Sequence, residues 1–203
     1  MKSSHLVNLD DHKDLEVIQR NLCYYHIRHY IGQHDKVIYE DGKMKIDYQL
    51  ELISKLIDHY DLYYENLPIG TQLSQTEPQP ADAFIVLIGQ ILFGFQLNLD
   101  EHIIEDDVIL QMILMFKKAM SKSPSNYYVK IFLVNLYNSI GAVKASHALI
   151  ETLDIKHIQY DTLGYLMSSP LLKCGLFSKA SMLFGNVLRF YAANFKDVNI
   201  FIL

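Results

Sequence analysis

Cysteine is scarce in this sequence, and its two cysteines, Cys23 and Cys174, lie 151 positions apart. This number and spacing exclude a disulfide framework and a zinc motif of closely spaced cysteines, and they fit a reducing compartment. The N-terminal stretch MKSSHLVNLDD also lacks the apolar segment of a secretory signal. We therefore expect a cytoplasmic protein.

Basic residues are missing from the middle of the chain. Residues 56–116 carry ten Asp or Glu and no Lys or Arg, whereas residues 117–203 carry ten Lys or Arg and four acidic residues. The formal net charge of −5 argues against DNA binding by the chain as a whole. Two interpretations of the uneven charge stay open: chance variation on solvated helix faces, or a basic C-terminal surface that meets an acidic partner or RNA.

An apolar run long enough to span a membrane is also missing. The strongest candidate is the segment 83–99, AFIVLIGQILFGFQLNL, which is interrupted by Gln90, Gln96 and Asn98. A spanning helix needs roughly 20 apolar residues, and this segment falls short of that length. The run is better explained as a helix buried on most sides within a stack of helices, so no membrane partner is expected.

Helical periodicity runs through almost the whole sequence. Apolar residues recur at steps of three and four, as in Leu15, Ile18, Leu22 and Tyr25, and strand alternation with hairpin turns is lacking, so no β-sheet is expected. The spacing predicts helices over 11–31, 45–66, 82–98, 103–121, 126–140, 142–153, 160–174 and 177–194. The chain then divides into a helical pair region (1–66), a proline-containing loop (67–81) and TPR-like helical repeats (82–203).

Two segments near the C-terminus repeat each other. GAVKASHALIETLD begins at Gly141 and GLFSKASMLFGNVLR begins at Gly175. The distance between the two glycines matches the period of the tetratricopeptide repeat (TPR), which is about 34 residues. Each glycine is expected to end a helix in the left-handed conformation, Ala180 to allow close helix approach, and Phe184 to fill the groove between pairs. The predicted fold is all-α, with TPR-like antiparallel helix pairs stacked in a right-handed superhelix, an α-α solenoid.

Residues that could carry chemistry are few. His26 and His29 share a helix face, but no HExxH pattern surrounds them, and Glu105, Asp106 and Asp107 lack the spacing of a calcium loop. The acidic cluster is expected in the first turn of a helix, where it complements the helix dipole. No phosphate loop or GxSxG nucleophile motif is present. We assign no catalytic, cofactor-binding or metal-binding residue and expect no cofactor.

The most distinctive linear segment is LDIKHIQYDTLGYL, residues 153–166. Asp161 and Thr162 are favourable helix-start residues, so the segment reads as a capped connection between repeats. The other interpretation is that its polar residues, Lys156, His157 and Gln159, face a partner protein.

Residues 123–198 resemble the auxiliary, non-catalytic subunit of the NatB N-terminal acetyltransferase complex. The resemblance is carried by SPSN, LVNLYNSIGA, LDIKHIQYDTLGYL and NVLRFYAANFKDV, which begin at residues 123, 133, 153 and 186. Residues 1–122 resemble the family loosely, through helix pairing and the apolar helix at 82–98. Family members are several times longer, so the chain is expected to be an internal portion or a truncated product. Pro170 departs from the pattern and is expected to kink or break the helix at 160–174.

The resemblance implies a function that composition does not. In that family a superhelix of TPR-like helices wraps around a small GNAT-fold catalytic subunit, which binds acetyl-CoA. The complex acetylates nascent proteins that start with Met-Asp, Met-Glu, Met-Asn or Met-Gln, and the auxiliary subunit stabilises its partner and brings it to the ribosome. The chain would then be a scaffold without enzymatic activity. Two alternatives stay open: a generic TPR-like adaptor for another complex, and an enzyme or small-ligand binder.

Overall fold

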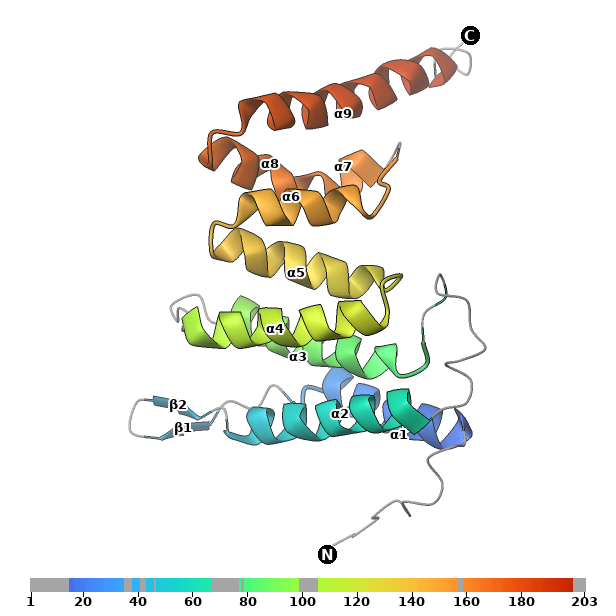
Figure 1. Cartoon of the computed structure of the whole chain (residues 1–203), viewed down its shortest axis with the longest axis vertical. Coiled ribbons are helices and arrows are strands. Elements are labelled where there is room, and N and C mark those ends of the chain that lie inside the picture. Colours follow the sequence, from blue (N-terminus) through green and yellow to red (C-terminus); the bar gives the residue numbers. More distant parts are fainter. Residues whose placement is uncertain are drawn as a thin grey trace, which may run out of the picture. The chain divides into compact units, whose positions relative to one another are not determined.

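The computed structural model describes residues 15–34, 38–40, 43–45, 47–66, 77, 79–98, 106–156 and 159–198. Helices dominate it (Figure 1). In chain order the elements are α1 (Leu15–Tyr30), β1 (Ile38–Glu40), β2 (Lys43–Lys45), α2 (Asp47–Asn66), α3 (Asp82–Asn98), α4 (Asp106–Lys122), α5 (Tyr127–Ser139), α6 (Val143–Glu151), α7 (Gln159–Leu163), α8 (Tyr165–Lys173) and α9 (Phe177–Val198).

The helical fold predicted from the spacing of apolar residues is confirmed. It is accompanied by one element that the spacing did not predict, a two-stranded antiparallel hairpin in which β1 pairs with β2, with Ile38 opposite Lys45 and Glu40 opposite Lys43. Most of the predicted loop at 67–81 lies outside the described residues, so that boundary stays a prediction, as does the right-handed superhelix.

The chain divides into two compact units. Unit 1 contains residues 1–105 and 115–129, and unit 2 contains residues 106–114 and 130–203. Helices α4 and α5 therefore each contribute residues to both units. The units are described separately below.

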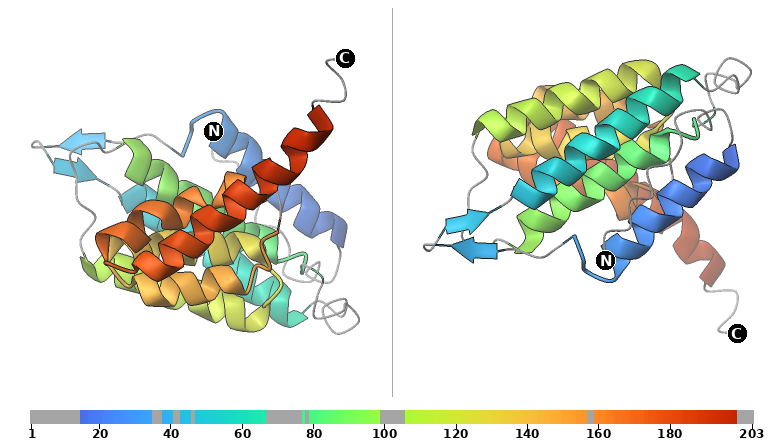
Figure 2. Two further views of the ribbon diagram at one scale, coloured as in Figure 1. Left: turned by 90° about the horizontal axis from the view of Figure 1, so that it is seen from above. Right: turned by 90° about the horizontal axis from the view of Figure 1, so that it is seen from below.

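Unit 1 is built around α3, which packs against both α1 and α2 (Figure 2). The apolar side chains of α3 are buried over several turns, because Phe84, Ile85, Ile88 and Ile91 are each at most 1% exposed. Phe84 contacts the Tyr63 ring of α2 at a centroid distance of 5.4 Å. Over residues 84–91 the helix is thus mostly enclosed by protein, as expected for this part of the segment 83–99. Over the residues that the structure describes, no helix is both long and apolar enough to cross a membrane.

Unit 2 consists of helices in successive layers (Figure 1). Two of its tight turns have the same geometry: Gly141 follows α5 with φ +74°, and Gly175 follows α8 with φ +70°. In each turn the residue after the glycine donates its backbone N–H to a carbonyl five positions back, Ala142 to Tyr137 and Leu176 to Leu171, both at 2.8 Å. This is the Schellman termination that favours glycine, and it confirms the predicted left-handed helix ends at Gly141 and Gly175.

The predicted helix at 160–174 is divided, but not at the proline. The division falls at Gly164, between α7 and α8, where an added Cβ would lie 2.2 Å from the Tyr160 carbonyl oxygen. Pro170 lies inside α8 and cannot donate to the Leu166 carbonyl four positions back. The Asn138 side chain of α5 donates to that carbonyl at 2.8 Å. A neighbouring helix therefore satisfies the acceptor that the proline leaves open, and α8 continues.

Candidate partner-binding surfaces

The connection from α6 to α7 holds the residues predicted to face a partner. Lys156 and Gln159 are exposed, and His157 lies outside the described residues. The Lys156 backbone N–H donates to Gln159 Oε1 at 3.0 Å, and the Lys156 ammonium group lies 2.5 Å from Asp154 Oδ2. The Gln159 side chain thus caps the turn that precedes α7. The sequence had suggested Asp161 and Thr162 as the residues that start this helix. Whether these residues contact a partner stays a prediction.

Asp161 instead connects α7 to α9. It accepts a hydrogen bond from the Tyr191 hydroxyl, and this bond, more than burial, raises the pKa of Tyr191 above its ordinary value. Tyr191 remains 40% exposed. The α7 connection and the C-terminal half of α9 therefore lie close enough to form one continuous surface.

One face of α9 exposes large apolar side chains. Phe177 is 66% exposed, Phe184 42% and Leu188 68%, whereas Ala180 on the packed side is 2% exposed. The prediction that Ala180 lies at a close helix contact is confirmed. The prediction that Phe184 fills a groove between pairs is wrong, because its ring is 42% exposed.

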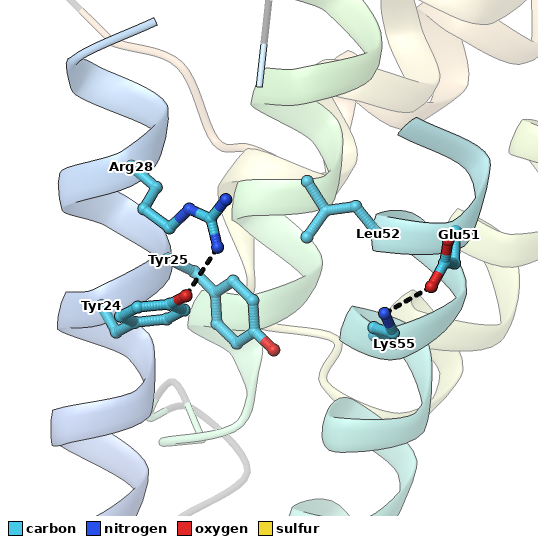
Figure 3. A pocket seen from close by; sticks show the side chains of 6 residues that line it. All are labelled: Tyr24, Tyr25, Arg28, Glu51, Leu52 and Lys55. Carbon is cyan, nitrogen blue, oxygen red and sulfur yellow. Dashed lines mark hydrogen bonds and ion pairs between the residues drawn. The ribbon is translucent and has the colours of Figure 1, made fainter. Parts of the chain in front are cut away.

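A shallow groove lies between α1 and α2 in unit 1, with a volume of about 220 Å³ (Figure 3). Tyr24, Tyr25 and Arg28 line it from α1, and Glu51, Leu52 and Lys55 line it from α2. Arg28 donates to the Tyr24 hydroxyl, and Lys55 pairs with Glu51 at 2.6 Å. Each of these two contacts links residues of the same helix, whereas the Tyr25 hydroxyl reaches across to His59 of α2 at 3.3 Å.

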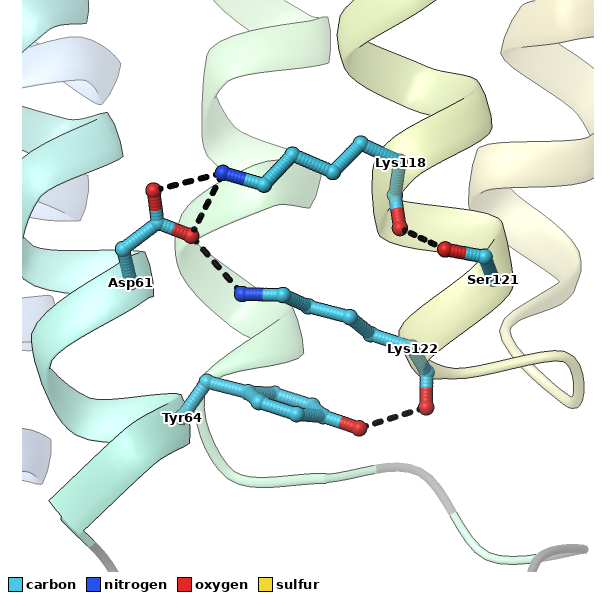
Figure 4. A network of polar contacts seen from close by, with 5 residues as sticks. All are labelled: Asp61, Tyr64, Lys118, Ser121 and Lys122. Atoms are coloured by element: carbon cyan, nitrogen blue, oxygen red, sulfur yellow. Dashed lines mark hydrogen bonds and ion pairs between the residues drawn. The ribbon is translucent and has the colours of Figure 1, made fainter.

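A polar network ties the C-terminal half of α2 to the end of α4 within unit 1 (Figure 4). Asp61 Oδ2 lies 2.9 Å from the Lys118 ammonium group, and Asp61 Oδ1 lies 2.8 Å from that of Lys122. Burial raises the pKa of Asp61, but hydrogen bonds from Lys122 and Lys118 outweigh it, and the net pKa is lowered. Lys122 also lies over the Tyr64 ring, 4.7 Å from its centroid, and the Tyr64 hydroxyl donates to the Lys122 carbonyl. These contacts hold the C-terminal half of α2 against the end of α4.

The histidines singled out in the sequence contact aromatic rings. His26 stacks on Tyr30 with a centroid distance of 6.0 Å, and His29 stacks on His34 at 5.9 Å. Burial, followed by the nearby His29, lowers the pKa of His26. Among the described residues, no group of three or more His, Cys, Asp or Glu side chains could hold a metal ion. Glu105 lies outside the described residues, and α4 begins at Asp106, which places Asp106 and Asp107 in a first turn as predicted.

The sequence did not reveal which side of α9 is exposed, the side on which Leu188 is 68% exposed. An apolar stripe in a sequence predicts burial and does not reveal which face of a helix lacks a cover.

Comparison with known proteins gives one consistent result. The family whose sequence pattern matches residues 2–203 is described as the N-acetyltransferase B complex (NatB) non catalytic subunit. The rat protein named N-alpha-acetyltransferase 25, NatB auxiliary subunit, is 28% identical over 190 residues, which cover 94% of this chain and 18% of the rat protein. Its human counterpart is 27% identical over 190 residues, with the same coverage of the two chains. The Phagocyte signaling-impaired protein of Aedes aegypti is 30% identical over 176 residues, which cover 87% of this chain and 17% of that protein. The chain thus spans less than a fifth of the length of these relatives.

Proposed function

Because the chain belongs to the family of non-catalytic subunits of the NatB complex, we propose that it acts as a helical scaffold in N-terminal protein acetylation. The observation that carries this proposal is the family match over residues 2–203. The architecture supports it, since TPR-like pairs of helices stack through their neighbours and present extended surfaces to partners.

The proposed partner is the GNAT-fold catalytic subunit of NatB, which would bind acetyl-CoA and perform the transfer. The proposed substrates are nascent chains that begin with Met-Asp, Met-Glu, Met-Asn or Met-Gln. The proposed place of action is the cytoplasm, at the ribosome. In this arrangement the chain contributes binding surface and no catalytic group, and Lys156, His157 and Gln159 are candidate contacts.

Reconstitution tests the proposal. The purified chain is mixed with the NatB catalytic subunit of the same organism, and complex formation is followed by size-exclusion chromatography. Acetyl transfer from acetyl-CoA to a Met-Asp peptide is measured in parallel. We expect a complex, no transfer by the chain alone, and activation weaker than that given by a full-length family member, because a solenoid binds through many repeats and each repeat contacts mainly its neighbours.

Two controls separate the possible failures. A catalytic subunit of a different acetyltransferase should not form the complex, and a Met-Lys peptide should not be acetylated. Absence of any complex at micromolar concentrations would argue against the scaffold function of this chain. Transfer that persists in the chain alone, after removal of all co-purified acetyltransferase, would show that the chain is an enzyme.

A further inference from the structure

One carboxyl of unit 1 is buried without a cation beside it. Asp82, the first residue of α3, is 4% exposed and makes no ion pair within the described part of the chain. Asp61, in contrast, contacts both Lys118 and Lys122 (Figure 4). A carboxyl that is removed from water and has no cation close to it favours its neutral, protonated form.

The strongest hydrogen bonds to Asp82 fall on one of its two oxygens. Oδ2 accepts from the Ser123 hydroxyl at 2.5 Å and from the Gln79 backbone N–H at 3.0 Å, and the Asn126 side chain makes a third, weaker contact with the carboxyl. Oδ1 is buried and has no hydrogen-bond partner among the described residues. A proton on Oδ1 leaves Oδ2 free to accept both bonds, so the protonated carboxyl fits this arrangement of donors.

The hydroxyl of Tyr60 on α2 is the second polar group in this position. The Tyr60 side chain is 3% exposed, and its hydroxyl also has no hydrogen-bond partner among the residues that the structure describes. The two groups lie close together, because the charge of Asp82 is, after burial, the largest cause that raises the pKa of Tyr60. Buried polar groups are rarely left without partners, and a phenol oxygen can accept a hydrogen bond from a protonated carboxyl.

The ionisable side chains nearby do not supply the missing positive charge. Those of this part of α2 and α4 are Tyr60, Asp61, Tyr64, Lys118 and Lys122. The tyrosines are uncharged near neutral pH, and both lysines contact Asp61. Burial accordingly raises the pKa of Asp82, and its three hydrogen-bond donors do not offset that shift.

We propose that the folded protein keeps a proton on Asp82 Oδ1, hydrogen-bonded to the Tyr60 hydroxyl, at pH values at which Asp61 is already ionised. This proton joins α2 to the start of α3, while Ser123 joins the same carboxyl to the turn between α4 and α5. The proposal concerns the stability of unit 1 and does not depend on the acetyltransferase function.

The direction of the pH dependence follows from the two states of the chain. The folded protein binds this proton more tightly than the unfolded chain does, because the pKa of Asp82 is raised on folding. The stability contribution is therefore fully present below the ordinary aspartate pKa of 3.8 and is lost as the pH rises through the higher pKa of the folded state. Asp61, whose pKa is lowered, contributes in the opposite direction.

Titration of the two carboxyls in the unmodified chain tests the proposal. The side-chain carboxyl ¹³C shifts of Asp82 and Asp61 are followed by NMR spectroscopy from pH 3 to 8, with circular dichroism to show where the helices persist. We expect the Asp82 shift to change with a midpoint above 3.8 and the Asp61 shift to change below it. A midpoint for Asp82 at or below 3.8 would overturn the proposal.

A pair of tyrosine variants tests the hydrogen bond to the proton. Tyr60→Phe should lower the midpoint of Asp82, because the protonated carboxyl loses its acceptor. Tyr64→Phe is the matched control and should leave that midpoint unchanged, since the Tyr64 hydroxyl donates to the Lys122 carbonyl. A higher midpoint in Tyr60→Phe would show that Tyr60 donates to an ionised Asp82, and equal shifts in the two variants would show that neither hydroxyl holds the proton; each result contradicts the proposal.

The variant Asp82→Asn imitates the protonated carboxyl, because its amide oxygen can accept from Ser123 and Gln79 and its NH₂ group can donate to Tyr60. Urea denaturation at pH 4 and 8 compares it with the unmodified chain and with Asp61→Asn. From pH 4 to 8 we expect Asp82→Asn to gain stability relative to the unmodified chain, by up to about tenfold in the folding equilibrium constant for each unit by which the pKa is raised. Asp61→Asn should show no such gain. Absence of the gain in Asp82→Asn would mean that the folded protein holds Asp82 ionised.

Discussion

The interiors of the two units are built from different side chains. Unit 1 buries the rings of Tyr60, Tyr63, Phe84 and Phe116, each at most 3% exposed. The buried apolar side chains described in unit 2 are aliphatic or methionine, and Phe177, Phe184 and Tyr191 on α9 are exposed. Unit 1 therefore obtains stabilisation from rings that it encloses. Unit 2 obtains its stabilisation from aliphatic side chains and methionines and leaves these rings of α9 exposed.

The polar contacts of the two units differ in the same way. Unit 1 uses carboxylates: Asp61 pairs with two lysines, and the buried Asp82 accepts hydrogen bonds from Ser123 Oγ at 2.5 Å and from the Gln79 backbone at 3.0 Å. In unit 2 the carboxylates of the Lys156–Asp154 and His147–Glu151 contacts are exposed, and the neutral Asn138 side chain donates to the Leu166 carbonyl. Substitutions of buried residues in unit 1 should therefore lower the free energy of unfolding more than substitutions of exposed residues in unit 2.

The largest effect is expected at Phe84. Its side chain is 0% exposed and contacts the Tyr63 and His59 rings at centroid distances of 5.4 and 5.7 Å. Phe84→Ala should lower the free energy of unfolding by about 3–5 kcal/mol, because it removes a buried ring and leaves a cavity. Urea denaturation followed by circular dichroism measures this change.

Phe184→Ala is the matched control in unit 2. Because this ring is 42% exposed, its removal should cost less than about 1 kcal/mol. Equal costs for Phe84→Ala and Phe184→Ala would mean that the ring of α9 is buried in solution and that the contrast between the units is wrong.

The second effect concerns Asp82, which is 4% exposed. Burial raises its pKa, and hydrogen bonds from Ser123, Gln79 and Asn126 oppose that shift. Asp82→Ala should cost about 1–3 kcal/mol, since the buried Ser123 hydroxyl loses its acceptor. Asp61→Ala should cost less than about 1 kcal/mol, because that ion pair is partly solvated. The comparison fails if Asp61→Ala proves the more harmful change in urea denaturation.

Features that depend on residues close in the sequence were predictable, whereas features that depend on how separate helices pack in space were not. Apolar spacing and the recurring glycine predicted the helices and the turns at Gly141 and Gly175, because both depend on nearby residues. The hairpin also has a local signal, the Asp-Gly dipeptide at 41–42 between the two paired strands. The exposure of individual side chains was harder to predict: a single sequence shows that α9 has an apolar face, but not that Ala180 is buried while Phe177 and Phe184 are exposed.

The third effect concerns the helix that contains a proline. Asn138→Ala removes the donor to the Leu166 carbonyl and should cost about 1 kcal/mol. In a Pro170→Ala background the same substitution should cost less, because an alanine at this position would supply its own backbone N–H to that carbonyl. A double-mutant cycle on the free energy of unfolding measures the coupling. Strict additivity of the two changes would show that Asn138 does not compensate for the proline.

The smallest effect is a pH dependence from His147 in unit 2. His147 is 7% exposed, and its Nδ1 lies 3.0 Å from the Lys179 ammonium group and 3.5 Å from Glu151 Oε1. Burial, and then Lys179, lowers the pKa of His147, while Glu151 opposes them. The unfolded chain therefore takes up a proton on this histidine at a higher pH than the folded chain does. The stability contribution is fully present above the ordinary histidine pKa of 6.5 and is lost as the pH falls through the lower pKa of the folded state.

Denaturation of the unmodified chain, His147→Gln and Lys179→Met at pH 7.5 and 5.5 measures this contribution. We expect the unmodified chain to lose more stability between the two pH values than His147→Gln does. Lys179→Met should lie between them, because removing the ammonium group allows the folded protein to protonate His147 at a higher pH. A loss in His147→Gln as large as that of the unmodified chain would assign the pH dependence to other groups, of which His26 in unit 1, with its lowered pKa, is the first to substitute.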